Sequence, residues 1–292
     1  MKKTILVTGA STGLGARIAL ISAAHGHKVW ASMRNLEKQG PLLAAKAAAN
    51  LDLEVVQLDV QDSASVQTAV AQIIAQDGKL DVLVNNAGAG FLRSTEQASE
   101  EDVRWVMDLN FHGVVRCTKA VLPHMRAAHS GHIVNITSVG GLVGQPFNEI
   151  YCAAKFAVEG YTESMASYME AAFGIKFSLV EPGGIQTDFA KNVMAKMEAD
   201  GGLLQDDYLP MLQRYIGTIR SRSAEETAQV YQTPEQCAEM VVACIEAEHP
   251  PLRMRTSHWA EQFCHLKTGL DPDGKLLQQQ VMAQLLGIVP KQ

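Results

Sequence analysis

The sequence predicts an α/β fold in which a doubly wound parallel sheet carries helices on both faces. Over the first two-thirds of the chain, short apolar runs rich in β-branched residues alternate with helical patterns. A glycine-rich turn directly follows the first of these runs, and the alternation stops past Thr187. Alternating strands and helices of this kind are typical of a parallel sheet joined by crossover helices.

Six apolar runs are expected to form the strands, at residues 5–8, 28–33, 54–59, 82–85, 132–137 and 176–181. Helices are expected between them, at 14–25, 63–77, 99–126 (bent or divided) and 151–172. In such a sheet, ligands bind at the carboxyl ends of the strands.

The last third reads as helices and loops. Residues 190–230 are expected to be helical with loops, and Thr233 is expected to cap a helix over 234–247 that has Pro234 at its first position. A less regular tail follows. The chain is expected to be a single domain, with a core at 1–188 and an extension at 189–292 that completes the substrate site.

Composition narrows the class of protein. The chain has 292 residues, is 47% hydrophobic and 19% charged, and has a formal net charge of −6, as expected for a globular protein without a nucleic-acid or membrane-surface partner. No signal peptide or membrane-spanning stretch is evident. The five cysteines form no Cys-x-x-Cys pair, so neither a metal site nor a disulfide framework is expected. A cytoplasmic location is expected, because free cysteines are typical of a reducing compartment.

The glycine-rich turn at residues 8–15 is a candidate pyrophosphate site. Its spacing is G-x-x-x-G-x-G, and glycine permits a tight turn while the next helix offers free N–H groups to an anion. A βα turn that binds nothing is the alternative. The residues expected to contact the cofactor here are Gly9, Ser11, Thr12, Gly13, Leu14 and Gly15.

The end of the second strand indicates which dinucleotide is bound. An NAD site usually places an acid there for the ribose 2′-hydroxyl, but the stretch 30–34 ends in Arg34 and has no acid before Glu37. Arg34 can bind a 2′-phosphate, with Ser11 adding a hydroxyl donor. The sequence therefore favours NADP(H), with NAD(H) as the alternative if Arg34 only faces solvent.

The ends of the third and fourth strands are expected beside the adenine and its ribose. Asp59 and Val60 end one strand, and Asn86, Ala87 and Gly88 follow the other. Small residues there let the backbone approach a ligand closely. Ordinary strand-end turns are the alternative.

Tyr151 and Lys155 share one helix face, and Ser138 lies thirteen residues before the tyrosine. A phenol has a pKa near 10, so lowering it by three units requires about 4 kcal/mol of differential stabilisation. A nearby ammonium and the positive nicotinamide are expected to provide it. Ser138 is expected to hydrogen-bond the substrate oxygen, and Asn110 to hold a water that relays protons to Lys155. An accidental Tyr–Lys pair is the alternative.

With these residues the chain resembles the short-chain dehydrogenase/reductase family over residues 1 to about 190. The resemblance implies a Rossmann fold, hydride transfer between an alcohol or carbonyl and the nicotinamide, and a tetrad of Asn110, Ser138, Tyr151 and Lys155. Asn110, Tyr151 and Lys155 are also expected to contact the cofactor, Lys155 by holding the nicotinamide ribose. In this family the turn at Pro182 and Gly183, with Ile185 and Thr187, meets the nicotinamide carboxamide.

The segments 28–34, 58–60, 138–142 and 146–157 are similar to the 17β-hydroxysteroid dehydrogenase and retinol dehydrogenase branch, which tends toward NADP(H). The turn at 181–184 departs somewhat from that of the steroid enzymes, and no match extends beyond about 190. The resemblance implies a bulky hydrophobic alcohol or ketone as substrate. Residues expected to line its cleft are Ser138, Val139, Gly140, Val143, Phe147, Tyr151 and Phe189.

Two rival functions remain. A non-catalytic NADP(H) sensor would be expected to lack a member of the tetrad, and this chain lacks none. An epimerase or dehydratase of the extended type usually has a G-x-x-G-x-x-G turn and a longer chain. In this family the helices corresponding to 99–126 and 151–172 commonly form a four-helix contact between subunits, so a homodimer or homotetramer is expected.

Overall fold

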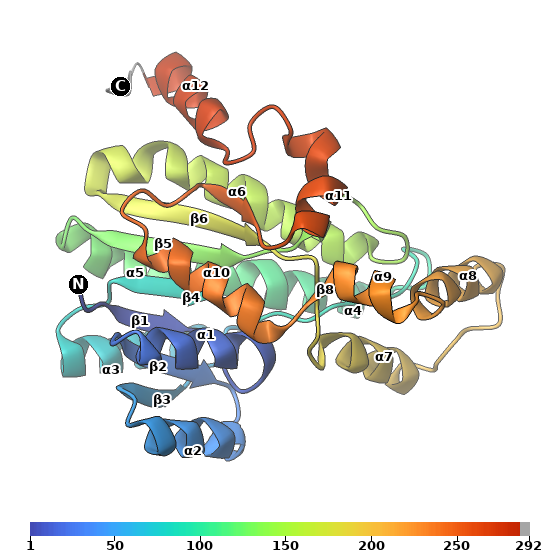
Figure 1. The fold of residues 1–292 in the computed structure, drawn as a ribbon, viewed down its shortest axis with the longest axis horizontal. Coiled ribbons are helices and arrows are strands. Elements are labelled where there is room, and N and C mark those ends of the chain that lie inside the picture. The colour runs from blue at the N-terminus through green and yellow to red at the C-terminus, as the bar shows by residue number, and fades with distance from the viewer. Residues whose placement is uncertain (287–292) are drawn as a thin grey trace.

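A computed structural model describes residues 1–286, and its centre is a seven-stranded parallel sheet in the order β3-β2-β1-β4-β5-β6-β9 (Figure 1). The doubly wound fold predicted from the sequence is confirmed. A separate two-stranded sheet pairs β7 with β8. The strands are β1 Thr4–Val7, β2 Lys28–Met33, β3 Leu53–Gln57, β4 Val82–Asn85, β5 Gly131–Ile136, β6 Ile175–Glu181, β7 Gly184–Ile185, β8 Tyr231–Gln232 and β9 Arg253–Arg255.

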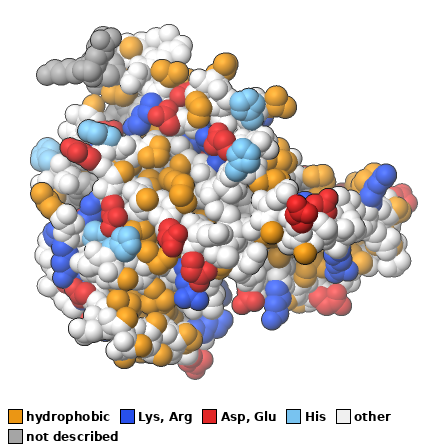
Figure 2. Space-filling model, viewed as in Figure 1, with side chains coloured by type: hydrophobic (Ala, Val, Ile, Leu, Met, Phe, Trp, Pro, Cys, Tyr) orange, Lys and Arg blue, Asp and Glu red, His pale blue; other side chains and the backbone are white. Residues whose placement is uncertain are grey.

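Helices cover both faces of the sheet, and α7, α8 and α9 extend beyond it on the right of Figure 1. Figure 2 shows charged side chains of both signs on that projecting part. The α-helices are α1 Gly13–Ala24, α2 Gly40–Ala49, α3 Ser63–Asp77, α4 Glu100–Met107, α5 Gly113–Ala127, α6 Glu149–Phe173, α7 Phe189–Ala199, α8 Leu209–Arg220, α9 Ala224–Val230, α10 Pro234–Glu246, α11 His258–Thr268 and α12 Lys275–Leu286.

The strands have one core on each face because successive side chains of a strand point to opposite sides. In β1, Ile5 and Val7 pack with α1 and α10 on one face, whereas Leu6 packs with α3, α5 and α6 on the other. Both faces of the central strands are therefore apolar, which explains why these strands read as continuous hydrophobic runs.

Several elements differ from the sequence prediction. The tail that was expected to be less regular forms helices α11 and α12, and the short strands β7 and β8 were not expected. Helix α2 was not expected, and it has a single fully buried side chain, Leu42, so it leaves little periodic pattern in the sequence. Strand β9 was also not expected, because it reads Arg-Met-Arg. Its two arginines are held by Glu181 of the neighbouring strand: Arg253 Nε donates to Oε1 at 2.9 Å and Arg255 Nη1 donates to Oε2 at 3.1 Å.

The other helix predictions agree with the structure. The stretch 99–126 is divided, as expected, into α4 and α5 by a π-helical turn at Asp108–His112. Residues 190–230 contain α7, α8 and α9. Thr233 caps α10, accepting a hydrogen bond from the Gln236 N–H, with Pro234 in the first turn.

A buried histidine makes stability depend on pH. His132 in β5 bonds Ser178 Oγ at 3.0 Å, and burial, together with Lys3, Lys176 and Lys275, lowers its pKa to about 3. Below pH 6.5 the unfolded chain protonates this ring, whereas the folded protein does so only near pH 3. The unfolded state thus binds more protons in this window, and stability falls as pH drops through it.

This histidine is expected to cost about 2–3 kcal/mol of unfolding free energy between pH 7 and pH 4.5, at 1.36 kcal/mol per pH unit below 6.5. Urea unfolding at both pH values measures the loss, which should be smaller by that amount in His132→Gln. The matched surface change is His124→Gln on α5. If His132→Gln and the parent lost the same unfolding free energy between the two pH values, the His132 ring would not contribute to the pH dependence of stability.

Candidate active site

A cleft of about 640 Å³ runs across the carboxyl ends of the strands. It lies where the strand order reverses between β1 and β4, which is the usual ligand site of a doubly wound sheet. Its walls come from the glycine-rich turn, the ends of β2 to β6, helix α6 and the α7–α9 region.

The glycine-rich turn needs its glycines for close packing. Gly9 has φ +67°, and a Cβ there would lie 2.8 Å from the Cα of Ala87. At Gly15 a Cβ would come within 2.4 Å of Asn86 Nδ2. Helix α1 begins here without a capping bond from the Thr12 side chain and without an acid in its first turn. Its first N–H groups therefore suit an anionic pyrophosphate.

Cationic side chains lie beside the end of β2. Arg34 and Lys38 both line the cleft and are exposed, and neither forms an ion pair with any residue of 1–286. Asp59 lines the same part of the cleft, with Oδ1 accepting the Gln61 N–H at 3.0 Å. This set fits a dinucleotide with an additional phosphate on its adenosine ribose, because two cations are available and no acid ends β2.

At the other end of the cleft, three predicted catalytic side chains meet. Ser138 follows β5 and caps a 3₁₀ turn, with its Oγ accepting the Gly140 N–H at 3.0 Å. Tyr151 and Lys155 project from the first turns of α6. Lys155 Nζ lies 5.7 Å from the centre of the Tyr151 ring and donates to the Ile136 carbonyl at 3.1 Å.

Burial shifts both ionisable groups toward their neutral forms. It raises the pKa of Tyr151 to about 12, against a lowering by the Ser138 hydroxyl. It lowers the pKa of Lys155 to about 8, against the charge of Glu159. The predicted lowering of the Tyr151 pKa is therefore not found in the protein alone. The reason is geometric: Lys155 lies over the ring and bonds a carbonyl, so desolvation dominates at the phenol oxygen.

Asn110 does not line the cleft. It is fully buried in the π-helical turn, where its Nδ2 donates to the carbonyls of Ala89 and Val106, both at 3.0 Å. It still adjoins the lysine, because a Cβ added to Gly88 would lie 2.7 Å from Asn110 Oδ1 and 3.6 Å from Lys155 Nζ.

Apart from Asn110, every residue predicted to contact the cofactor lines the cleft. Of the predicted substrate residues, Ser138, Val139, Tyr151 and Phe189 line it, whereas Gly140, Val143 and Phe147 do not. Val143 packs against the buried cluster of Val139, Leu142, Ala260 and Cys264, and Phe147 packs in a cluster with Leu92, Met197 and Leu212. These two side chains are apolar like cleft residues, so the sequence pattern does not separate the two roles.

Sequence reasoning missed a further set of lining residues. Those past Thr187 lie where no strand pattern indicates which side chains face the sheet, and the others lie at strand ends and on helices of the core. Lys38 was detectable, since it lies one turn past Arg34. The lining residues missed are Met33, Asn35, Lys38, Leu58, Ala89, Trp105, Leu109, Ile136, Thr137, Gln145, Asn148, Gly184, Asp188, Ala190, Asn192, Tyr215, Ile219, Arg222, Val230, Tyr231 and Trp259.

Residues 1–286 contain neither a candidate metal site nor a membrane-spanning helix. Within them, no three or more His, Cys, Asp or Glu side chains are grouped so as to hold a metal ion. No helix in the same range combines the length and apolarity needed to cross a bilayer.

Fold and cleft together define a dinucleotide-binding type of oxidoreductase. Residues 3–198 match the family model for short chain dehydrogenases, so the chain belongs to the short-chain dehydrogenase/reductase family and is an oxidoreductase. It is 39% identical to retinol dehydrogenase 8 of Bos taurus over 288 residues, covering 94% of this chain and 87% of that one. It is 36% identical to 17-beta-hydroxysteroid dehydrogenase type 1 of Mus musculus over 276 residues, covering 92% and 78%. The predicted branch of the family is thereby confirmed.

Solved structures of the family share the fold. A short-chain dehydrogenase from Streptomyces avermitilis has a TM-score of 0.75 and 31% identity, with 98% of each chain covered. A family member from Burkholderia phymatum in complex with NAD has a TM-score of 0.75 and 25% identity, with 95% of each covered. An actinorhodin polyketide ketoreductase with NADPH has a TM-score of 0.73 and 27% identity, covering 88% and 96%.

Proposed function

We propose that this protein uses NADP(H) to interconvert a secondary alcohol and a ketone, or an aldehyde, on a hydrophobic substrate. The observation that carries the proposal is the single cleft that has Arg34 and Lys38 at one end and Ser138, Tyr151 and Lys155 at the other. The family members with NAD and with NADPH support a nicotinamide dinucleotide, and Arg34 favours the phosphorylated form.

Each catalytic side chain has one task. When bound, the dinucleotide supplies the hydride in reduction and accepts it in oxidation. Ser138 donates a hydrogen bond that orients and polarises the substrate carbonyl. Tyr151 transfers its proton to that oxygen as the carbon is reduced, and takes the proton back in the oxidative direction. Lys155 binds the nicotinamide ribose, and buried Asn110 holds the backbone around Gly88.

The hydroxyl of Tyr151 can act as the acid in reduction. In the protein alone burial raises its pKa to about 12, so the phenol carries the proton that a ketone needs. Oxidation needs the phenolate, so its rate is expected to rise with pH across the alkaline range, whereas reduction should not.

Several aromatic side chains line the cleft, among them Trp105, Phe189, Tyr215 and Trp259. The relatives named for 17-beta-hydroxysteroid and retinol dehydrogenation support a bulky hydrophobic alcohol or ketone. We propose a steroid-, retinoid- or aromatic-like compound. In this proposal residues 1–188 form the core of a single domain, 189–292 complete the substrate site, and the protein assembles as a homodimer or homotetramer.

The test is the change in absorbance at 340 nm with NADPH or NADH and a panel of steroid, retinoid and aromatic ketones and aldehydes. Turnover with a bulky hydrophobic carbonyl and preference for NADPH are expected. Binding of NADPH without turnover of any compound would instead favour the NADP(H) sensor. Turnover of equal efficiency with NADH would remove the assigned cofactor preference.

A further inference from the structure

Helix α7 forms part of the wall at the substrate end of the cleft. Phe189, Ala190 and Asn192, from its first turn, line the cleft. The Phe189 ring packs edge-on against the Tyr151 ring, with centroids 6.0 Å apart and an interplanar angle of 60°. Whatever fixes α7 therefore also fixes the aromatic wall beside the reacting oxygen.

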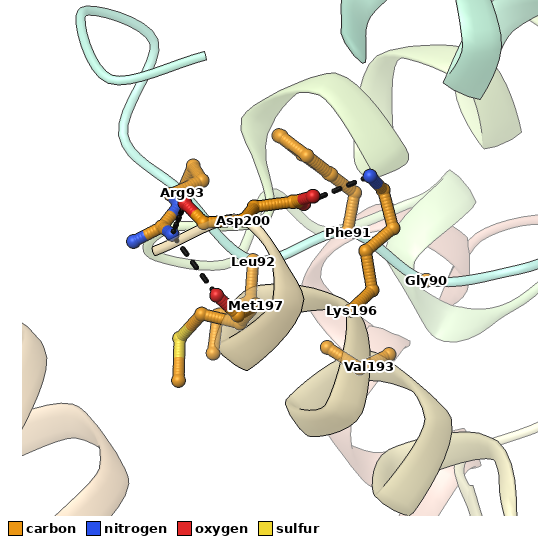
Figure 3. A pocket seen from close by; sticks show the side chains of 8 residues that line it. All are labelled: Gly90, Phe91, Leu92, Arg93, Val193, Lys196, Met197 and Asp200. Atoms are coloured by element: carbon orange, nitrogen blue, oxygen red, sulfur yellow. Dashed lines mark hydrogen bonds and ion pairs between the residues drawn. The ribbon is translucent and has the colours of Figure 1, made fainter. Parts of the chain in front are cut away.

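The other end of α7 is held by a buried arginine, Arg93, which is 4% exposed and lies in the segment after β4. Its guanidinium donates to the carbonyl oxygen of Gly202 at 2.7 Å. It also donates to the carbonyl oxygens of Asp200 at 3.1 Å and Met197 at 3.2 Å, both drawn in Figure 3. These carbonyls lie at or just beyond the carboxyl end of the helix, where carbonyl groups carry partial negative charge. The Met197 carbonyl also accepts the Gly202 N–H at 3.0 Å, so Arg93 and the backbone share this helix end.

The three carbonyls are the hydrogen-bond partners that stabilise the buried charge of the Arg93 guanidinium. No carboxylate of residues 1–286 forms an ion pair with Arg93; the nearby Asp200 carboxylate pairs with Lys196 at 2.8 Å. Lys196 also reaches Asp102 at 3.4 Å and lies 4.8 Å from the centre of the Trp105 ring. Since a buried charge without partners is strongly unfavourable, Arg93 stabilises its surroundings only while α7 is docked.

The segment around Arg93 also packs closely against the amino-terminal turn of α7, which lines the cleft. A Cβ at Gly90 would lie 2.6 Å from Val193 Cγ2 and 2.9 Å from Phe189 Cε1. The Arg93 backbone N–H donates to the Phe147 carbonyl at 2.9 Å, which joins the same segment to the loop before α6. The recess between residues 90–93 and α7 has no room for a water molecule (Figure 3).

We propose that Arg93 is a positioning residue for the substrate: it clamps the carboxyl end of α7, and thereby sets how closely Phe189 and Asn192 approach a ketone bound at Tyr151. The inference rests on the proposed function for its substrate. Arg93 does not itself line the cleft, so its effect passes through α7.

Kinetics of Arg93→Ala and Arg93→Lys test the clamp. In Arg93→Ala, KM for a bulky hydrophobic ketone is expected to rise about tenfold, equivalent to about 1.4 kcal/mol, while the Kd of NADPH changes less than about twofold. The KM of Arg93→Lys should lie between that of the parent and that of Arg93→Ala. Guanidinium chloride at a non-denaturing concentration should lower the KM of Arg93→Ala, whereas equimolar NaCl should not. Arg104→Ala, on the exposed face of α4, is the matched control.

Amide hydrogen exchange gives a readout that needs no substrate. Exchange over residues 189–202 should accelerate in Arg93→Ala while the strands of the sheet remain protected. Faster exchange there without turnover of any ketone by the parent would defeat the proposed reaction but not the clamp. Unchanged exchange at 189–202, or an equal loss of NADPH and ketone binding, would overturn the clamp. If Arg93→Ala does not fold, Arg93→Lys decides by the same measurements.

Discussion

Tyr151→Phe is expected to lower kcat for ketone reduction by about 10³-fold, within the range found for removal of a general acid. The substitution removes only the hydroxyl, and the phenyl ring keeps its contact with Phe189. Affinity for NADPH should stay within about twofold, because the ring and the buried Lys155 remain in place. Steady-state absorbance at 340 nm measures kcat, and fluorescence titration with NADPH measures the affinity for the cofactor.

The control for this substitution is Tyr168→Phe, which removes a hydroxyl from an exposed position on the same helix. It should leave kcat unchanged. If Tyr151→Phe retained turnover close to that of the parent, another group would have to supply the proton, and the role assigned to Tyr151 would be wrong.

Arg34→Ala is expected to lower kcat/KM with NADPH by about 10- to 100-fold, corresponding to the loss of a charge-assisted hydrogen bond to a phosphate. The value with NADH should change little, since that cofactor has no 2′-phosphate. Steady-state kinetics with both cofactors and one ketone provide the comparison. Lys38 lies on the same side and limits the loss.

Arg126→Ala, an exposed position at the end of α5, controls for removal of a surface arginine. Its preference between the two cofactors should match that of the parent. An unchanged preference in Arg34→Ala as well would mean that Arg34 only faces solvent, the alternative that the sequence leaves open.

The sequence predicts the strands of the sheet well where both faces of a strand are buried. The central strands are largely apolar on both faces, so they stand out as runs between helices. β9 does not, because its stability comes from Glu181, a residue 72 positions from Arg253. A local pattern cannot reveal a pairing between segments so far apart in the chain.

The residues of the candidate site also fall into a group that the sequence predicts and a group that it does not. Backbone turns and strand ends place nearly every predicted cofactor residue, because their positions follow from the fold. The pKa of Tyr151 was not predictable from its spacing to Lys155, since helical spacing does not say whether an ammonium faces the oxygen or the ring. Phe147 and Val143 show the same limit for apolar residues, which pack behind the cleft rather than along it.

The pairing of Arg253 and Arg255 with Glu181 has a consequence during biosynthesis. Strand β6 is synthesised before β9, so Glu181, which is fully buried in the folded protein, has neither arginine partner until 72 further residues have been added. A nascent or prematurely terminated chain lacking residues 253–255 would have to bury Glu181 beside the catalytic helix without either arginine, which is unfavourable whether the carboxyl stays charged or takes up a proton. We expect such chains to stay incompletely folded, which makes completion of the polypeptide a condition for assembling the catalytic cleft.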